Sequence, residues 1–566
     1  MEFVVFICVL AAIFTVMIGQ EILQAKKQEK QFAASLRENY GKEKTKEYSP
    51  ERFARLASYL KRHPEPGQID DITWNDLGMD DVFLRIDRTM SAAGEEYLYY
   101  TLRNVTCGKE VTEHLEEVVT WLEREETARV RIQLLMRKLG HLGKYSLYDY
   151  LDNLDYLGDR SGMSKRTVLG DLLYLPFMVL LFLQPSIGMI GIVGCMLWHI
   201  LTYFREKKVI EPYIISFAYV LRLSDICEEL VKLDIPVYTG EMEELKAAVG
   251  SVRELRKGSY WVMAGNRGQT GGNPLDILVD YLRMIFHFDI LQFNRMLAKI
   301  REKTDPVDVM LKNVGYLDMA SSIGAFRNSL EEYCLPEFLP KDGGACLDME
   351  NGWHPLLKNA VKNSIRAEKG VLLTGSNASG KSTFLKTVAV NAILAQTIHT
   401  CTAKKYRAPV FCIYSSMALR DNMADGESYY IVEIRSLKRI LDAAAGKDGP
   451  ILCFVDEVLR GTNTVERIAA ATQILHSLSS GNTLCFAATH DIEMADLLRE
   501  DYDNYHFEET IEEGNIIFPY RLLPGKTSTK NAIRLLELMG YEETITKNAA
   551  KCAEQFLKTG RWSNPV

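Results

Sequence analysis

The residues best suited to chemistry lie in a glycine-containing segment at residues 371–386, VLLTGSNASGKSTFLK. Val371 to Thr374 predict a buried strand, and the apolar run that follows Lys381 predicts a helix. Between them, Gly375 and Gly380 let backbone N–H groups curl around a phosphate without a Cβ in the way. The N-terminus of the helix adds partial positive charge. The strand, the GxxxxGKS loop and the helix form a P-loop, which predicts a nucleotide site.

Each polar residue of this loop has an expected role. Lys381 can reach the β- and γ-phosphates, and Ser382 can offer its hydroxyl to Mg²⁺. A fortuitous glycine-rich turn is the alternative, and the strand before the loop and the helix after it argue against that alternative. The residues expected to bind the nucleotide are Gly375, Ser376, Asn377, Ala378, Ser379, Gly380, Lys381, Ser382 and Thr383.

Two carboxylates end a second apolar run, ILCFVDE at 451–457. A buried strand would present both at its carboxyl edge, where α/β sheets place ligands. Asp456 is suited to hold Mg²⁺ through its water shell, and Glu457 is suited to polarise the attacking water. His490 ends a further predicted strand, FAATH, and could hydrogen-bond the γ-phosphate or that water. The alternative for His490 is a strand-end histidine satisfied by backbone groups.

Composition sets broad limits on the protein. The chain has 566 residues, of which 25% are charged and 47% apolar, so several mostly soluble globular domains are expected. The net charge of −8 gives no global basic signal for nucleic acid, so any polyanion contact needs a local patch. The 11 cysteines form no CxxC pair. That pattern favours reduced thiols in a cytosolic setting over disulfides or zinc.

Two apolar stretches predict membrane spans. Residues 3–19 are uncharged, and the basic residues just beyond them favour a retained anchor with that side in the cytoplasm. Residues 172–204 contain no Lys, Arg, Asp or Glu, and Gln184–Pro185 divides them into two short halves with basic flanks at both ends. We therefore expect about three spans in the cell membrane and a cytoplasmic ATPase domain. The alternatives are a buried N-terminal helix and a buried core hairpin.

The expected fold is an α/β P-loop NTPase domain with an ABC-type head, preceded by a mainly α-helical core domain with transmembrane segments. Strands are expected near 371–374, 410–414, 451–455 and 483–488, a hairpin over 504–523 turning at Glu513–Gly514, and helices at 531–539 and 542–558. The expected domains are an anchor (1–20), a polar, solvated helical stalk (21–70), the helical core (71–345, with a hairpin at 168–204), the ATPase domain (346–525) and a C-terminal helical tail (526–566).

Several segments resemble the ATPase domain of the MutS family. They are GSNASGKSTFLKTVAVNAILAQ (375–396), DNMADGESYYIVEI (421–434), FVDEVLRGTNT (454–464) and FAATH (486–490). WHPLL (353–357) resembles the entry motif of that domain, and residues 520–541 resemble its helical tail. The likeness is close over about 350–560 and looser over about 72–345, where VFLRIDRTMSAAGEEYLYYTLR resembles the start of the family's helical core.

This resemblance implies a homodimer with composite ATP sites and Mg²⁺ as cofactor. Ser428 matches the serine presented to the other subunit's γ-phosphate, and 461–464 matches a segment that crosses the dimer interface. DNA, bound without sequence specificity, is the partner that the family implies. The mismatch-reading domain and the nuclease tail of some members are expected to be absent. An ATP-driven membrane machine on a non-DNA partner, or a scaffold that hardly hydrolyses ATP, are the alternatives.

Overall fold

The computed structural model describes most of the chain. The described residues are 19–20, 23–43, 46–105, 109–141, 146–152, 154–158, 160–253, 284–301, 303–340, 343–376, 379–417, 429–446, 449–460, 462–512, 515–527 and 532–562. The chain divides into two compact units. Unit 1 comprises 1–64, 86–101 and 114–329, and unit 2 comprises 65–85, 102–113 and 330–566.

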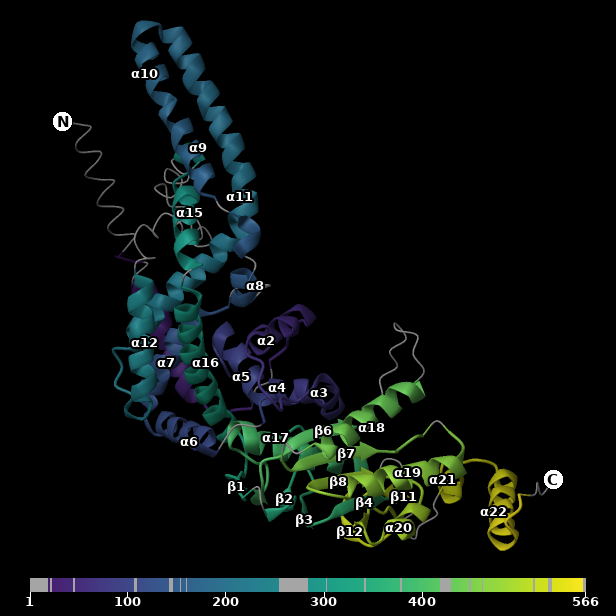
Figure 1. Ribbon diagram of the computed structural model, residues 1–566. Coiled ribbons are helices and arrows are strands. Elements are labelled where there is room, and N and C mark those ends of the chain that lie inside the picture. The colour runs from purple at the N-terminus through teal and green to yellow at the C-terminus, as the bar shows by residue number, and fades with distance from the viewer. Residues whose placement is uncertain are drawn as a thin grey trace. The chain divides into compact units, whose positions relative to one another are not determined.

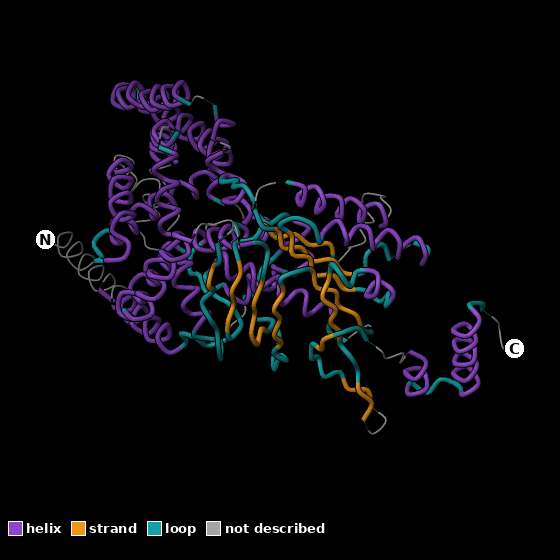
Figure 2. Tube along the Cα trace, turned by 60° about the horizontal axis from the view of Figure 1, so that its bottom comes forward, coloured by secondary structure: helices purple, strands orange, loops and turns teal. Residues whose placement is uncertain are grey.

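The described part of unit 1 is built from helices (Figures 1 and 2). Short breaks at 87–91 and at Glu125 interrupt its helical runs. Its elements, two of which cross into unit 2 at one end, are α2 (Pro50–Arg62), α5 (Ala92–Arg103), α6 (Lys109–Arg124), α7 (Glu126–Leu139), α8 (Leu147–Asp152), η1 (Leu154–Leu157), α9 (Ser161–Leu172), α10 (Tyr174–Leu183), α11 (Pro185–Leu230), η2 (Pro236–Tyr238), α12 (Thr239–Val252), α15 (Phe288–Ile300) and α16 (Thr304–Arg327).

The apolar hairpin expected at 168–204 is present as two packed helices, α10 and α11, which run side by side in Figure 1. The chain turns at Gln184, as expected, but α11 continues to Leu230. Two helices, Lys165–Leu183 and Pro185–Glu211, are long and apolar enough to cross a membrane, and both are mostly exposed. The third expected span, 1–20, lies almost wholly outside the described residues.

The segment expected to be a solvated stalk is partly buried, so that expectation is wrong for α2. Leu56 and Tyr59 lie in the core of unit 1, and the guanidinium of Arg55 donates to Glu95 at 2.7 Å. Glu95 is fully buried, and Arg52 and Lys46 also pair with it. A buried carboxylate needs such partners, because an unpaired one would pay the full cost of desolvation. The polar composition of this segment therefore reflects charged side chains that form ion pairs inside unit 1, and not a segment surrounded by water.

Unit 2 contains the sheets (Figure 2). Its main sheet has the strand order β12-β9-β4-β8-β7-β6, parallel except for β12, and a second sheet has the order β1-β5-β2-β3. The strands are β1 (Glu337–Phe338), β2 (Leu347–Gly352), β3 (Asn363–Ala367), β4 (Gly370–Thr374), β5 (Lys405–Ala408), β6 (Cys412–Ser416), β7 (Ile451–Asp456), β8 (Thr483–Ala488), β9 (Tyr502–His506), β10 (Thr510–Glu512), β11 (Asn515–Ile517) and β12 (Leu523–Pro524).

Helices cover both faces of this sheet, which explains why its strands read as unbroken apolar runs. On one face, Cys453 and Val455 of β7 share a buried cluster with Leu437 and Leu475. The helices of unit 2 are α3 (Asp71–Leu77), α4 (Met79–Ile86), α17 (Lys381–Ile398), α18 (Tyr429–Ala445), α19 (Thr464–Leu478), α20 (Glu493–Leu497), α21 (Ala532–Leu538) and α22 (Glu543–Thr559).

The four expected strands of the α/β region are confirmed at β4, β6, β7 and β8. The expected hairpin over 504–523 is confirmed as two antiparallel pairs, β10 with β11 and β9 with β12, and β9 also joins the parallel sheet beside β4. A segment far upstream also belongs to this unit. Ser415 of β6 donates to Asp76 of α3 at 2.7 Å, and Arg439 of α18 donates to Asp70 at 2.5 Å.

Candidate nucleotide site

The phosphate-binding loop joins β4 to α17 and uses its two glycines for different reasons. Gly375 has φ 143°, and a Cβ there would lie 2.5 Å from the carbonyl oxygen of Phe507. Gly380 has φ 109° and is the residue that precedes α17. Both conformations disfavour L side chains. The loop backbone is therefore available to a phosphate at the N-terminus of a long buried helix.

Lys381 opens α17 and points back into the loop. Its Nζ donates to the carbonyl oxygens of Gly375 and Ser376, each at 2.8 Å. Burial lowers the pKa of Lys381, while the charges of Asp456, Glu457 and Glu509 act in the opposite direction. A cation held in this way by neutral carbonyls is poised to exchange them for phosphate oxygens, which bind it more strongly.

Ser382 and Asp456 meet where α17 begins and β7 ends. The hydroxyl of Ser382 donates to Asp456 Oδ2 at 2.5 Å. Burial raises the pKa of Asp456, and the neighbouring charge of Glu457 raises it further. Among the described residues, the buried Oδ1 of Asp456 has no hydrogen-bond partner. A hydroxyl beside a carboxylate with a spare oxygen is a donor set that fits Mg²⁺.

Glu457 follows β7 with φ 55°, a left-handed conformation that is uncommon for a non-glycine residue. Its Oε1 lies 2.6 Å from Nε2 of His490, which comes two residues after β8. Its Oε2 lies 2.9 Å from Nη1 of Arg460. Because β7 and β8 are parallel neighbours, their carboxyl ends bring Glu457 and His490 together. The sequence predicted this pair of residues but not the contact with Arg460.

A cavity of about 460 Å³ lies beside the loop. Of the predicted residues, those that line it are Ser376, Ser379, Gly380, Lys381, Ser382, Thr383 and Glu457. The structure adds lining residues that the sequence did not assign to the nucleotide site, among them His354 of the WHPLL segment, Asn363, Phe507 and Tyr520. The side chain of Asn363 donates to the carbonyl of Tyr520 at 2.9 Å and accepts from the N–H of Leu522, so it fixes one wall. Glu509, also missed, accepts from Ser376 at 2.8 Å.

Three of the predicted residues, Asn377, Ala378 and Ser428, lie outside the described part of the chain. A helix, α19, begins within the polar segment that follows the carboxylates. Asn463 is the N-cap of α19, and its Oδ1 accepts from the N–H of Val465 at 2.9 Å.

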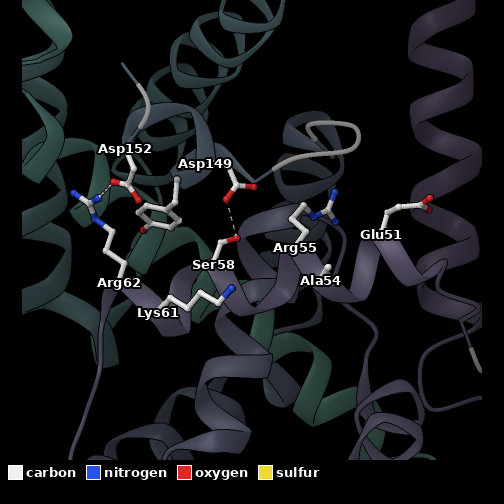
Figure 3. Close-up of a pocket in the computed structure, with 9 residues that line it drawn as sticks. Glu51, Ala54, Arg55, Ser58, Lys61, Arg62, Asp149 and Asp152 are labelled. Carbon is white, nitrogen blue, oxygen red and sulfur yellow. Dashed lines mark hydrogen bonds and ion pairs between the residues drawn. The ribbon is translucent and has the colours of Figure 1, made fainter. Parts of the chain in front are cut away.

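Unit 1 has a separate hollow of about 330 Å³ between α2 and α8. Figure 3 shows that charged groups line it, with Arg62 paired to Asp152 and Ser58 donating to Asp149. The other cations that line the hollow are Lys61 and Arg55, and Arg55 pairs with Glu95. Opposite charges thus neutralise one another around this hollow, so it lacks the surplus of donors that the phosphate-binding loop offers.

Comparison with known proteins points to one family. Residues 371–557 match the family model for MutS domain V. Over 222 residues the chain is 31% identical to the DNA mismatch repair protein MutS of Thermus thermophilus, covering 38% of this chain and 26% of that protein. It is 28% identical over 296 residues to MutS protein homolog 4 of Homo sapiens, covering 49% of this chain and 31% of that protein. The match therefore spans about a quarter to a third of these relatives.

Proposed function

The chain belongs to the MutS family through its domain V, and from that premise we propose that it binds and hydrolyses ATP and couples the cycle to clamping of a partner. The observation that carries this proposal is the convergence of Lys381, Ser382 and Asp456 with the Glu457–His490 pair. These are the groups that phosphoryl transfer to water requires: a phosphate clamp, a metal-binding carboxylate and a base.

In the proposed reaction, the residues of this chain position the phosphates of ATP and activate the attacking water. Lys381 gives up its loop carbonyls and binds phosphate oxygens. Glu457 accepts the proton of the attacking water, and His490 holds the carboxylate that does so. Mg²⁺, held by Ser382 and Asp456, would supply charge neutralisation at the phosphate oxygens. This arrangement gives hydrolysis by positioning and electrostatics, without a covalent intermediate on the protein.

We further propose that the active form is a homodimer with composite sites. The support is the family relationship, in which Ser428 matches the serine presented to the other subunit's γ-phosphate and residues 461–464 match a segment that crosses the dimer interface. Closure of two heads on ATP would then clamp DNA without sequence specificity. The family makes DNA the default partner, whereas the net charge of −8 requires that any DNA-binding patch be local.

The α10–α11 hairpin supports a proposed location in the cell membrane, with the ATPase domain in the cytoplasm. Its outward side chains include Phe182, Leu183 and Ile190, all more than 70% exposed. Exposed apolar surface of this extent is costly in water and stable in lipid. The same observation favours a second candidate function: an ATP-driven machine that acts on a membrane partner and not on DNA.

One experiment separates these two functions. The ATPase rate of the full chain in nanodiscs is measured with and without duplex, branched and single-stranded DNA, over a range of salt. Stimulation by one DNA form that falls steeply as salt rises supports the DNA clamp. Steady hydrolysis that responds to no DNA supports the membrane machine. Absence of any ATP hydrolysis contradicts both and leaves a scaffold that only binds ATP.

A further inference from the structure

Three side chains from distant parts of unit 1 meet at the base of the α10–α11 hairpin. Asp171 lies near the end of α9, His199 within α11, and His287 immediately before α15. One ligand atom from each of the three lies within 4.8 Å of the other two. α15 packs against both α9 and α11, and Figure 1 shows α9 and α15 beside α11. The cluster belongs to unit 1, whereas the nucleotide site belongs to unit 2.

The ring of His199 is buried, with a side chain that is 1% exposed. Its Nδ1 lies 2.9 Å from the carbonyl oxygen of Ile285 and 3.3 Å from Asp171 Oδ1. The hydrogen bond to the Ile285 carbonyl places the ring proton on Nδ1. Nε2 then carries a lone pair, and among the described residues it has no hydrogen-bond partner.

The ring of His287 is arranged in the same way. It is also buried, and its Nε2 lies 3.3 Å from the hydroxyl of Thr202. That hydroxyl has backbone carbonyls to donate to, at 2.9 Å on Trp198 and 3.0 Å on His199. Thr202 therefore accepts from Nε2–H, which leaves the lone pair on Nδ1 of His287. Within the described part of the chain, no group donates to this buried nitrogen.

Asp171 completes the set. Its Oδ1 is buried and, as far as the described residues go, accepts no hydrogen bond. Two imidazole lone pairs and a carboxylate oxygen, all withdrawn from water, incur a desolvation cost with nothing to offset it. A Lewis acid would satisfy all three at once. The outer groups already present, the Ile285 carbonyl and the Thr202 hydroxyl, are of the kind that orient metal-binding histidines.

We propose that Asp171, His199 and His287 bind a divalent transition metal ion, with Zn²⁺ as the best fit. Two imidazoles and one carboxylate suit Zn²⁺ and exclude Ca²⁺ and Mg²⁺, which prefer oxygen ligands. Ligand atoms about 2.1 Å from a tetrahedral ion lie about 3.4 Å apart, so binding draws the three side chains closer together. The bound ion ties the base of the hairpin to α15 and retains one coordination position for water.

The test uses the full chain after removal of metal by a chelator, with Zn²⁺ and Co²⁺ as probes. We expect one Zn²⁺ per chain, measured by competition with a chromogenic chelator, and at least 100-fold weaker binding in His199→Ala and in the near-isosteric Asp171→Asn. The control is His476→Ala, an exposed histidine of α19 that is outside unit 1 and should bind Zn²⁺ as the parent does. Mg²⁺-dependent ATP hydrolysis serves as an independent readout of folding in each variant.

A second readout needs no variant. Co²⁺ bound by two histidines shows paramagnetically shifted imidazole N–H resonances and the visible absorption of a low-symmetry ion. We expect two such shifted resonances. Substoichiometric Zn²⁺, equal affinity in the parent and Asp171→Asn, or a Co²⁺ spectrum without shifted imidazole signals would each overturn the proposal.

Discussion

Glu457 Oε1 lies 2.6 Å from Nε2 of His490, across the carboxyl ends of two neighbouring parallel strands. The backbone of Glu457 is itself fixed, because its N–H donates to the carbonyl of Ala488 at 2.9 Å. The carboxylate is thus oriented by a neighbouring strand and not by its own loop alone. Such orientation is what a general base needs if it is to meet a water held beside a phosphate.

Substitution of Glu457 by Gln should separate binding from turnover. The amide keeps the shape of the side chain but cannot accept a proton, so we expect ATP binding to persist while kcat falls by about 100- to 10,000-fold. Equilibrium binding of ATP and release of phosphate measure the two quantities. Glu466→Gln, in the first turn of α19, is the matched control and should hydrolyse ATP at the parent rate. Parent-rate hydrolysis by Glu457→Gln would show that the base is another group.

His490→Ala should act through Glu457. Removal of the imidazole frees the carboxylate, and we expect a smaller loss of kcat than in Glu457→Gln, with little change in ATP affinity. The double variant should then be no slower than Glu457→Gln alone, because residues that act as a unit are not additive. Additive losses in this double-mutant cycle would mean that His490 has its own role at the phosphate.

Gly375→Ala tests the loop geometry. The added methyl group would meet the carbonyl oxygen of Phe507 at 2.5 Å, in a backbone conformation with φ 143°. We expect a loss of stability of about 1–3 kcal/mol and weaker ATP binding. Gly343→Ala is the control, since nothing lies within 4 Å of its added Cβ. Equal ATP affinity in the two variants would be evidence that the loop is not held by β9 and the residues after it.

Local sequence was sufficient for the centre of the nucleotide site. The apolar runs before Gly375 and Asp456 identify parallel strands, and parallel strands deliver their carboxyl ends to one edge. It was insufficient for Asn363 and Glu509, which reach the loop from segments that have no motif, and for Tyr520, which begins the 520–541 segment but was not expected at the nucleotide site. Their roles depend on β3 and on the chain after β9, and no spacing in the sequence encodes that proximity.

In unit 1, too, spacing in the sequence does not show which residues lie close together in the fold. Asp171, His199 and His287 are too far apart in sequence to form a metal-binding pattern, and each alone would be assigned to an apolar helix or loop. The polar α2 was assigned to solvent because composition cannot show that Arg55 has Glu95 as a buried partner. Burial of oppositely charged side chains as pairs depends on the tertiary structure. It allows a polar segment, which usually indicates exposure to solvent, to pack in the interior.

The hairpin depends on a close approach that the glycines of α11 permit. A Cβ on Gly191 would lie 2.1 Å from the ring of Phe177 in α10, whereas a Cβ on Gly194 would meet nothing within 4 Å. We therefore expect Gly191→Leu to overpack the hairpin and to lower the free energy of unfolding by about 1–3 kcal/mol. The thermal unfolding midpoint of the detergent-held chain should fall accordingly. Gly194→Leu should leave the midpoint almost unchanged. Equal midpoints would contradict the packing of α10 on α11.

Stability should also depend on pH through Glu96, a buried residue of α5. Burial raises its pKa from the ordinary 4.5 to about 8, although Ser146 donates a hydrogen bond at 2.8 Å and Arg55 lies nearby. Asp149 and Glu95 add to the increase. The folded protein therefore keeps a proton that the unfolded chain loses above pH 4.5.

The sign follows from this difference in bound protons. Between pH 4.5 and about 8 the folded state holds more protons than the unfolded state, so the free energy of unfolding falls as pH rises, by at most about 1.4 kcal/mol per pH unit. Glu96→Gln cannot ionise, and its urea midpoint should fall less across this range than that of the parent. Parallel pH profiles for the two proteins would mean that Glu96 is ionised in the folded state, and that Arg55 compensates its charge.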